Sequence, residues 1–258
     1  MDSLEESISL RGRVAIVTGG SKGIGRAAAV RLAQAGVNVV INYLSDEAGA
    51  GETLRLVESA GAAGLSVRAD VSKLGEADAL VRRAWEQFGR LDILVCNAGV
   101  WEGAPAESLA EGVWDRTLAI NLKGTWALCR AAIPFLKERG WGRIIAVSST
   151  AGQRGEAYYS NYAASKGGQV AFVKSLAVEL GGHGITVNAV APGWVDTEMT
   201  SHVFSDEGRR REIEEAIPLR RVASADDIAL PILFLCSDWA RHVTGGVLSV
   251  NGGSVLCD

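Results

Sequence analysis

The amino-acid sequence predicts an α/β fold in which about seven parallel strands form one sheet with helices on both faces. Apolar runs rich in β-branched residues recur along the chain, and helix-like stretches, several of them ending at glycine, separate these runs. This alternation is typical of a doubly wound parallel sheet, because each connection crosses the sheet as a helix. No Pro- or Gly-rich linker divides the chain, so we expect a single domain over residues 1–258.

The first apolar run, Arg13–Thr18, leads directly into a glycine-rich turn. The turn extends from Gly19 to Gly25, and a strongly helix-forming stretch follows it as far as Gly36. A strand, such a turn and a helix together form a cradle for phosphate, because glycine permits close backbone approach and a helix N-terminus presents unpaired N–H groups. The Gly-x3-Gly-x-Gly spacing at the start of an α/β chain therefore predicts a dinucleotide site.

The other strands are expected where the apolar runs recur, and one later segment breaks the pattern. With the first run included, the expected strands lie at residues 13–18, 37–42, 65–69, 91–96, 142–148, 184–190 and 247–250. Residues 194–223 interrupt the alternation with a charged stretch at 209–215, which by itself is typical of a solvated helical face. Residues 1–11 precede the first strand, and we expect them to be a flexible N-terminus.

The composition limits the classes of function. The formal net charge is −4 and there is no basic run, so we expect no nucleic-acid binding. No apolar run approaches the roughly 18 residues that cross a bilayer. The N-terminus is acidic where a signal peptide would be basic, so we expect a cytoplasmic protein that does not enter the membrane. The four cysteines and three histidines show no metal-ligand spacing, so we expect no metal.

Tyr162 and Lys166 form the most informative pair in the chain. They lie four residues apart in a helix-like stretch, Ser160–Lys166, and this spacing places both side chains on one helical face. A cation one turn from the phenol favours the phenolate, so we expect the pKa of Tyr162 to fall from its ordinary value of about 10 toward neutrality. A tyrosine of this kind can exchange protons with a substrate, although the spacing alone also arises by chance.

Several motifs in this order resemble those of the short-chain dehydrogenase/reductase family, and the resemblance covers residues 12–254. The chain is similar to the 3-oxoacyl-thioester (acyl-carrier-protein) reductases and to the many secondary-alcohol dehydrogenases near them. The resemblance implies a Rossmann-like fold and an enzyme that interconverts a ketone and a secondary alcohol with a nicotinamide cofactor. The motifs are the glycine turn after Thr18, Asn97-Ala98-Gly99, a helical Asn121, Ser149 thirteen residues before Tyr162, the pair Tyr162 and Lys166, Pro192-Gly193, and the C-terminal Leu248–Gly253.

The resemblance also implies which residues bind the cofactor. They lie in the glycine turn, after the second, third and fourth strands, in the catalytic pair and around the Pro-Gly motif. They are Gly19, Ser21, Lys22, Gly23, Ile24, Gly25, Asn42, Asp70, Val71, Asn97, Ala98, Gly99, Tyr162, Lys166, Pro192, Gly193, Val195 and Thr197. Asp70 corresponds to the aspartate that hydrogen-bonds the adenine, and its alternative role is to cap the helix near Ser72.

The end of the second strand indicates the choice of cofactor. NAD-preferring relatives carry an acidic residue there that accepts both ribose hydroxyls, whereas this chain has the neutral Asn42. Lys22 matches the basic residue that NADP-preferring relatives place beside the 2′-phosphate. Leu44 departs from the Arg or Lys of many NADP-binding relatives. Asp46 and Glu47 either weaken phosphate binding or begin a helix capped by Ser45. We favour NADP(H) over NAD(H).

The family mechanism gives each catalytic residue a role. Ser149 would hold the substrate oxygen and Tyr162 would donate the proton. Lys166 would lower the pKa of the tyrosine and bind the nicotinamide ribose, while Asn121 would anchor a water that links Lys166 to solvent. Neither Tyr158 nor Tyr159 has a lysine four residues later, and we expect Ser148 to point to the opposite side of its strand from Ser149.

The substrate is less well indicated. Trp101 and Trp194 each follow a cofactor motif and are expected to flank the pocket, which favours an apolar or planar substrate. Polar contacts are expected from Gln153, Arg154, Glu156 and Tyr159, which lie between Ser149 and Tyr162. Residues 194–223 correspond to the mobile substrate lid of the family. We expect a 3-oxoacyl-thioester-type reductase, with a dehydrogenase of a sugar, steroid or other small secondary alcohol as the alternative.

Other classes of protein and the assembly state follow from the same resemblance. A catalytically silent NADP-binding protein would keep the glycine turn and lose the four catalytic residues, which are all present. An epimerase or dehydratase of the extended family would need a longer C-terminal region. The helices near residues 112–137 and 158–181 typically pair between subunits in the family, so we expect a homotetramer whose ligand is a small molecule.

Overall fold

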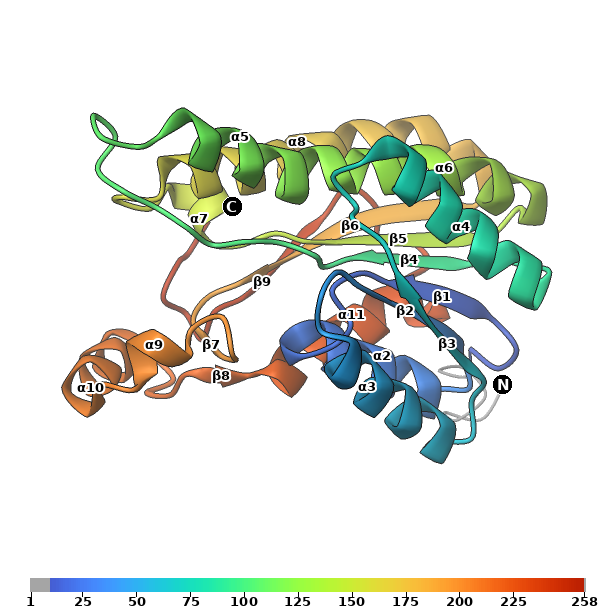
Figure 1. The fold of residues 1–258 in the computed structure, drawn as a ribbon, viewed down its shortest axis with the longest axis horizontal. Coiled ribbons are helices and arrows are strands. Elements are labelled where there is room, and N and C mark those ends of the chain that lie inside the picture. Colours follow the sequence, from blue (N-terminus) through green and yellow to red (C-terminus); the bar gives the residue numbers. More distant parts are fainter. Residues whose placement is uncertain (1–9, 258) are drawn as a thin grey trace.

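The structure is a computed structural model, and it describes residues 10–257. Its centre is a seven-stranded parallel sheet with the order β3-β2-β1-β4-β5-β6-β9 (Figure 1). This arrangement confirms the predicted fold class, and each of the seven expected strands is present. The strands are β1 (Val14–Val17), β2 (Asn38–Tyr43), β3 (Gly64–Arg68), β4 (Ile93–Cys96), β5 (Gly142–Val147), β6 (Ile185–Pro192) and β9 (Val247–Val250).

Helices cover both faces of this sheet (Figure 1). One face carries α4 (Leu74–Phe88), α6 (Gly124–Arg139) and α8 (Ser160–Leu180). The opposite face carries α2 (Gly23–Gln34), α3 (Glu47–Ser59) and α11 (Ala225–Cys236). The remaining elements are α5 (Glu111–Leu118), the π-helical turn η1 (Ala119–Lys123), α7 (Ala151–Arg154), the short 3-10 turns η2 (Gly181–His183) and η3 (Asp238–Ala240), α9 (Ser201–Phe204), α10 (Glu207–Ala216), and the strands β7 (Val195–Asp196) and β8 (Ala223–Ser224).

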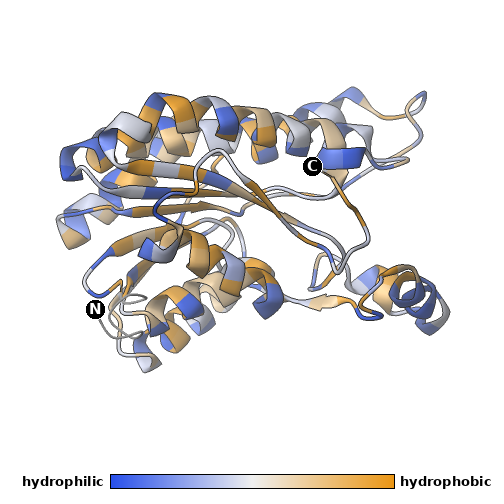
Figure 2. Cartoon of the chain, turned by 180° about the vertical axis from the view of Figure 1, so that it is seen from behind, coloured by the Kyte–Doolittle hydropathy of each residue, from blue (hydrophilic) through white to orange (hydrophobic). Residues whose placement is uncertain are grey.

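The core lies on both sides of the central strands, which explains why these strands are apolar throughout rather than alternating. Every residue of β1, β4, β5 and β6 is buried. Figure 2 shows apolar residues running along the sheet and the sheet-facing sides of the helices. A parallel sheet that is covered twice buries both faces of each strand, so a continuous Val/Ile/Leu run is the expected pattern. None of the described helices is both long and apolar enough to cross a membrane.

The strand order places the functional part of the fold at one edge. Chain connections run outward in opposite directions from β1 and β4, which are adjacent in the sheet. A crevice forms at such a reversal, beyond the carboxyl ends of the strands, and ligands bind in it. The glycine turn follows β1 and the Asn97-Ala98-Gly99 motif follows β4, so both lie at this edge.

Residues 194–223 fold into a small unit of their own beside this edge (Figure 1). The unit contains β7, α9, α10 and β8, and it has a separate apolar cluster formed by Phe204, Ile213, Ile217 and Val222. Its charged helix α10 is exposed on the outer side, as the sequence predicts. The mobility of this segment stays a prediction.

The N-terminus differs from the expectation at one point. Residues 1–9 lie outside the described part of the chain, so the expected flexibility there stays a prediction. Leu10 is buried in the core, and its N–H donates to the carbonyl of Ala35. An apolar side chain that packs beside α2 belongs to the folded domain, so the domain begins before Arg11.

The helices that were expected to pair between subunits present large apolar side chains to solvent. Ala127 and Ala177 are buried and pack toward the sheet. Trp126 on α6 and Val178 on α8 are exposed by 41% and 86%, respectively. The homotetramer stays a prediction, and these two residues are the ones that such pairing would cover.

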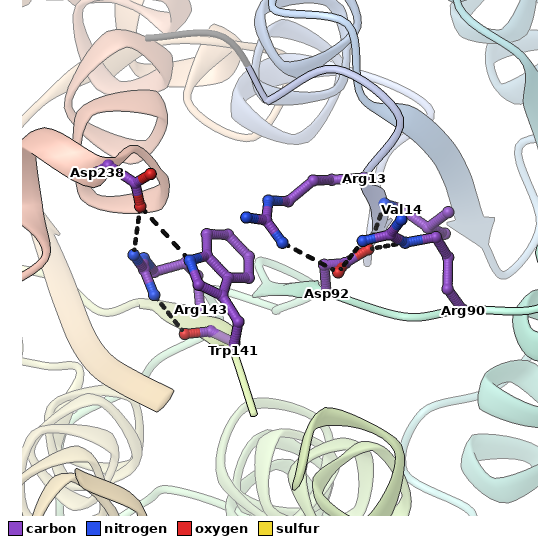
Figure 3. A network of polar contacts seen from close by, with 8 residues as sticks. Arg13, Val14, Arg90, Asp92, Trp141, Arg143 and Asp238 are labelled. Carbon is purple, nitrogen blue, oxygen red and sulfur yellow. Dashed lines mark hydrogen bonds and ion pairs between the residues drawn. The ribbon is translucent and has the colours of Figure 1, made fainter. Parts of the chain in front are cut away.

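A network of charged side chains joins the opposite edge of the sheet, at the amino ends of the strands (Figure 3). Asp92 is fully buried and accepts hydrogen bonds from the Val14 N–H at 2.9 Å and from Arg90 at 2.7 and 2.8 Å. Arg13 approaches the same carboxylate at 3.4 Å, and its guanidinium carbon lies 3.3 Å from the centroid of the Trp141 ring. The network thus ties β1, β4 and β5 together through side chains.

We expect the substitution Asp92→Asn to lower the free energy of unfolding by about 3 kcal/mol, because Arg13 and Arg90 then lose the buried negative charge with which they pair. Urea unfolding of the variant measures this loss. The conservative substitution Asp78→Asn removes an exposed ion pair to Arg130 instead, and we expect it to cost less than about 1 kcal/mol. Equal losses in the two variants would contradict a structural role for the Asp92 network.

Candidate active site

The glycine turn forms a tight cradle between β1 and α2. Gly19 and Gly23 have φ angles of +61° and +52°, which side chains rarely adopt. A Cβ atom at Gly25 would lie 2.2 Å from the carbonyl oxygen of Gly19, so only glycine fits there. Helix α2 begins at Gly23, and its first N–H groups therefore face the turn. The backbone has the shape and polarity of a phosphate site.

Residues from β1 and β4 hold this turn in place. The Thr18 hydroxyl accepts hydrogen bonds from the N–H groups of Asn97 and Ala98, both at 3.0 Å. The Asn97 side-chain amide donates to the carbonyls of Thr18 at 2.9 Å and Gly19 at 3.1 Å. Asn97 therefore braces the turn against the central strands, which is the role that its position predicts.

Two of the predicted cofactor residues make local contacts. The Asn42 side-chain amide is buried and donates to the carbonyl of Ala69 at 3.0 Å, so it holds β2 to the chain after β3. Its backbone carbonyl accepts from the Gly20 N–H. The Asp70 carboxylate accepts from the N–H and the hydroxyl of Ser72, at 3.0 and 2.7 Å. Asp70 thus closes a local turn with Ser72 but does not cap α4, whose N-cap residue is Lys73, so the alternative role is wrong and adenine binding stays a prediction.

The region that would receive a 2′-phosphate contains charges of both signs. Lys22 is exposed and immediately precedes α2. Asp46, and not Ser45 as expected, caps α3, because its carboxylate accepts from the Gly49 N–H at 3.0 Å. That hydrogen bond and one from Ser21 hold the pKa of Asp46 below its usual range, with a smaller contribution from Lys22.

The structure brings Ser149, Tyr162 and Lys166 together in one cavity of about 450 Å³. Helix α8 begins at Ser160, so Tyr162 and Lys166 lie in its first two turns and face the ends of β5 and β6. Ser149 follows β5, and it forms a hydrogen bond with Tyr162. Ser148, the rejected alternative, is buried and donates to the backbone carbonyl of Lys166 at 3.0 Å. The cavity therefore contains the predicted trio.

The pKa of Tyr162 differs from the expectation. Burial raises it to about 12, although the hydrogen bond with Ser149 opposes this change. The Lys166 ammonium lies 5.6 Å from the centroid of the Tyr162 ring and donates to the carbonyl of Val147 at 2.7 Å. Burial also lowers the pKa of Lys166 to about 8. Desolvation and, to a smaller extent, the negative charge of Glu156 raise the pKa of Tyr162, so the predicted fall in this pKa is wrong.

Asn121 occupies the π-helical turn η1, which interrupts the continuous helix formed by α5 and α6. Its side chain is fully buried and fixes the Asn-Ala-Gly loop, since it accepts from the Val100 N–H at 2.8 Å and donates to the Val100 carbonyl at 3.0 Å. It also donates to the Ser165 hydroxyl at 3.0 Å. A Cβ at Gly99 would lie 3.2 Å from the Asn121 amide oxygen and 3.6 Å from the Lys166 ammonium. Asn121 thus braces the site, and its water relay stays a prediction.

Aromatic side chains form one wall of the cavity. Trp101 and Trp194 both line it, with ring centroids 5.7 Å apart and nearly perpendicular planes. Tyr159 stacks on the far side of this arrangement, 4.6 Å from Trp101, and does not line the cavity itself. Phe204 from the lid segment contacts Trp194 at 5.8 Å. The two tryptophans are therefore placed as predicted, and Tyr159 supports one of them.

The structure places only some of the polar residues between Ser149 and Tyr162 in the cavity. Arg154 and Glu156 line it, as expected. Gln153 donates to the Ser249 hydroxyl at 2.9 Å and is turned away from the cavity toward β9. Gln153 lies in α7 and Glu156 just after it, so the sequence indicated the segment but gave no signal for the direction of each side chain.

The other predicted cofactor residues surround the same edge. Val71 is buried against Gly124, where an added Cβ would lie 3.0 Å from a Val71 methyl group. Thr197 lies beside Gly23, whose added Cβ would be 3.4 Å from it. The remaining cavity-lining members of the predicted set are Ile24, Asn97, Gly99, Pro192, Gly193 and Val195. A dinucleotide fits this arrangement, because one continuous edge joins a phosphate cradle to the cavity that holds Tyr162.

The fold and this site together define an oxidoreductase that acts on an alcohol or ketone with a nicotinamide cofactor. The family model described as enoyl-(acyl carrier protein) reductase matches residues 19–254. The chain belongs to the short-chain dehydrogenase/reductase family.

Characterised relatives of the chain differ in their substrates. A 3beta-hydroxysteroid dehydrogenase from Eggerthella lenta is 43% identical, with 96% of this chain and 95% of the relative covered. A 3-oxoacyl-[acyl-carrier-protein] reductase from Staphylococcus aureus is 38% identical, with coverage of 94% and 98%. An L-rhamnose 1-dehydrogenase (NAD(P)(+)) from a Sphingomonas species is also 38% identical, with coverage of 95% and 96%.

A solved structure shows the same likeness in three dimensions. A chain from Beutenbergia cavernae that was solved with NADP at low occupancy superposes with a TM-score of 0.91 and 38% identity. The match covers 96% of this chain and 98% of that one. The resemblance to the family and to its 3-oxoacyl reductases is thus confirmed, while the relatives as a group leave the substrate open.

Proposed function

We propose that the protein is an NADP(H)-dependent oxidoreductase that interconverts a small ketone and its secondary alcohol. One observation carries this proposal: Ser149, Tyr162 and Lys166 converge in a cavity at the same sheet edge as the glycine turn. When bound, the nicotinamide would supply or accept the hydride. The protein must then position the substrate oxygen and move one proton to or from it.

The residues divide these tasks as follows. The Ser149 oxygen accepts from the Ala151 N–H at 3.1 Å, which fixes its direction and leaves its hydroxyl proton available to a substrate oxygen. Tyr162 keeps its proton at neutral pH, since its pKa lies at about 12, and it can therefore act as the acid in ketone reduction. One N–H of the Lys166 ammonium donates to the Val147 carbonyl, so two N–H groups remain to donate to a ribose. The positive charge of the ammonium also lies near Tyr162.

Support for NADP(H) over NAD(H) comes from Lys22, because the described structure gives its ammonium no ion pair and places it at the cradle. Asn42 cannot accept from both ribose hydroxyls as a carboxylate does, because its side chain has a single acceptor oxygen; its NH2 group donates to the Ala69 carbonyl. The negative charge of Asp46 opposes phosphate binding. Hydrogen bonds from Ser21 and Gly49 to its carboxylate partly offset this effect. We propose that the attraction of Lys22 for the 2′-phosphate exceeds the repulsion by Asp46.

We expect Lys22→Gln to raise the KM for NADPH by about tenfold or more, because a charged hydrogen bond to a phosphate contributes about 1.5–3 kcal/mol. The KM for NADH, which lacks the 2′-phosphate, should change by less than about twofold. Initial-rate measurements with both cofactors test this, with Lys174→Gln, an exposed lysine of α8, as the matched control. Equal changes for the two cofactors would contradict the proposed role of Lys22.

Two substrate classes remain for this reaction, and the cavity favours one of them. Trp101 and Trp194 present flat apolar surfaces, which suit a ring ketone or ring alcohol. A 3-oxoacyl thioester is the second candidate, and it is supported by the likeness to the 3-oxoacyl reductase and by Arg154, which could meet an anionic carrier group. A ring substrate needs no extended channel, and it is our first candidate.

The test is NADPH oxidation by the purified protein with cyclohexanone, 2-hydroxycyclohexanone and an acetoacetyl thioester. Turnover of the ring ketones with little turnover of the thioester is the expected result. Efficient thioester reduction alone would replace the first candidate with the second. No turnover of any ketone, together with no oxidation of the matching alcohols by NADP⁺, would contradict the proposed reaction.

A further inference from the structure

We propose that Glu156 determines substrate specificity by accepting a hydrogen bond from a substrate hydroxyl group, so that the preferred substrate is a ring that carries a hydroxyl next to the reacting carbon. This inference rests on the proposed ketone–alcohol reaction and names the substrate class of the same site. It begins from the position of Glu156, which lines the cavity that contains Ser149 and Tyr162.

The carboxylate is held in one place. The Trp101 indole N–H donates a hydrogen bond to Glu156, and Trp101 is itself stacked on Tyr159 with an angle of 12° between the rings. The lid contributes His202, whose ring lies 5.7 Å from that of Trp101. Because Tyr159 and His202 both pack against Trp101, the indole N–H is held in place beside Glu156.

The same carboxylate forms no contact ion pair among the described residues, and the more distant Arg154 cation only partly opposes the rise in its pKa. In the described part of the chain no basic nitrogen lies within 4.0 Å of Glu156, whereas Arg209 and Glu212, which also line the cavity, pair with each other at 2.9 Å. Ionised carboxylate oxygens offer about four acceptor positions, and the Trp101 indole uses one. Burial raises the pKa of Glu156, in keeping with a carboxylate that has lost water and gained little in return.

An unpaired carboxylate in this cavity selects among substrates. A plain hydrocarbon ring would remove its remaining water without replacing the hydrogen bonds, which is unfavourable. An anionic substrate group would be repelled. A hydroxyl group would donate to Glu156 while the apolar face of its ring lies on Trp101 or Trp194.

Arg154 distinguishes a hydroxyl from a cationic amine. Its guanidinium lines the same cavity two residues before Glu156, and the structure gives it no hydrogen bond or ion pair within the described residues. A second cation near Arg154 would be disfavoured, whereas a hydroxyl both donates to a carboxylate and accepts from a guanidinium. The pair of side chains therefore matches a hydroxyl-bearing ring better than an amine.

The test compares two substrates that differ by one hydroxyl group. In NADPH oxidation, the wild-type kcat/KM for 2-hydroxycyclohexanone should exceed that for cyclohexanone by about tenfold or more, the effect of one hydrogen bond to a charged group. Glu156→Leu should reduce this ratio to about one, and Glu156→Gln, which keeps an acceptor oxygen, should give an intermediate ratio. Glu179→Gln, an exposed glutamate of α8, should leave the ratio unchanged.

A binding measurement keeps the inference testable without turnover. With NADP⁺ bound to a Tyr162→Phe background, calorimetry compares cyclohexane-1,2-diol with cyclohexanol, and the diol should bind more tightly only when Glu156 is present. A wild-type ratio near one, or a ratio that Glu156→Leu leaves unchanged, would overturn the inference even if both ketones are reduced. Selective diol binding without any turnover would instead retain the role of Glu156 and contradict the proposed reaction.

Discussion

Replacing Tyr162 with phenylalanine is expected to lower kcat for ketone reduction by about 10³-fold, because the cavity then lacks the group that donates the proton. Among the described residues that line the cavity, Tyr162 carries the only phenol. It forms a hydrogen bond with Ser149 and lies one helical turn from Lys166. NADPH affinity should change by less than about threefold, since the substitution removes one hydroxyl and leaves the rest of the proposed cofactor site intact.

Stopped-flow NADPH oxidation and fluorescence titration of NADPH measure these two quantities. The matched control is Tyr159→Phe, which removes a hydroxyl from the neighbouring tyrosine but keeps its stacking on Trp101. We expect the control to lower kcat by less than about fivefold. A Tyr162→Phe variant with near wild-type kcat would show that another group, or solvent, supplies the proton.

The substitution Lys166→Met is expected to abolish most activity and to stabilise the unliganded protein at neutral pH. Burial lowers the pKa of Lys166 to about 8, whereas in an unfolded chain it is about 10.4. The unfolded state therefore binds more protons between these two values, so wild-type stability rises with pH across that window. Below pH 8 the ammonium is charged in both states and the full cost of its burial, about 3 kcal/mol, applies.

Thermal unfolding from pH 6.5 to 10 tests this expectation. At pH 7 the variant should melt about 6–12 °C above the wild type, and the difference should shrink toward pH 10. The variant lacks the hydrogen bond to Val147 at every pH, so this loss changes the difference in melting temperature by the same amount at pH 6.5 and at pH 10. A difference in melting temperature that does not depend on pH would mean that burial does not lower the pKa of Lys166.

Local sequence patterns were sufficient for much of this site. The glycine turn depends on short-range geometry, and the close approach of Gly25 to the Gly19 carbonyl is a property of consecutive residues. The spacing of Tyr162 and Lys166 likewise depends only on helical periodicity. Seven apolar runs also predicted seven strands, because a sheet buried on both faces requires apolar residues at every position.

Features that depend on tertiary packing could not be predicted in the same way. The rise in the pKa of Tyr162 comes from burial by several elements, which spacing along one helix does not reveal. Gln153 and Glu156 lie three residues apart, and only the folded loop decides that Glu156 meets Trp101 while Gln153 meets Ser249. The capping of α3 by Asp46 in place of Ser45 depends on where the turn after β2 ends.

The π-helical turn around Asn121 has a consequence for how this chain can change. It holds one residue more than a regular helical turn, so deleting a residue such as Leu122 would restore an unbroken α-helix. Because the π-helical turn absorbs the extra residue, α5 and α6 should keep nearly the same relative orientation after such a deletion. Ala127 and Leu136 would then stay in the core. The position of Asn121 relative to Val100 would change, so a length change at this point would alter the site while leaving the core packed.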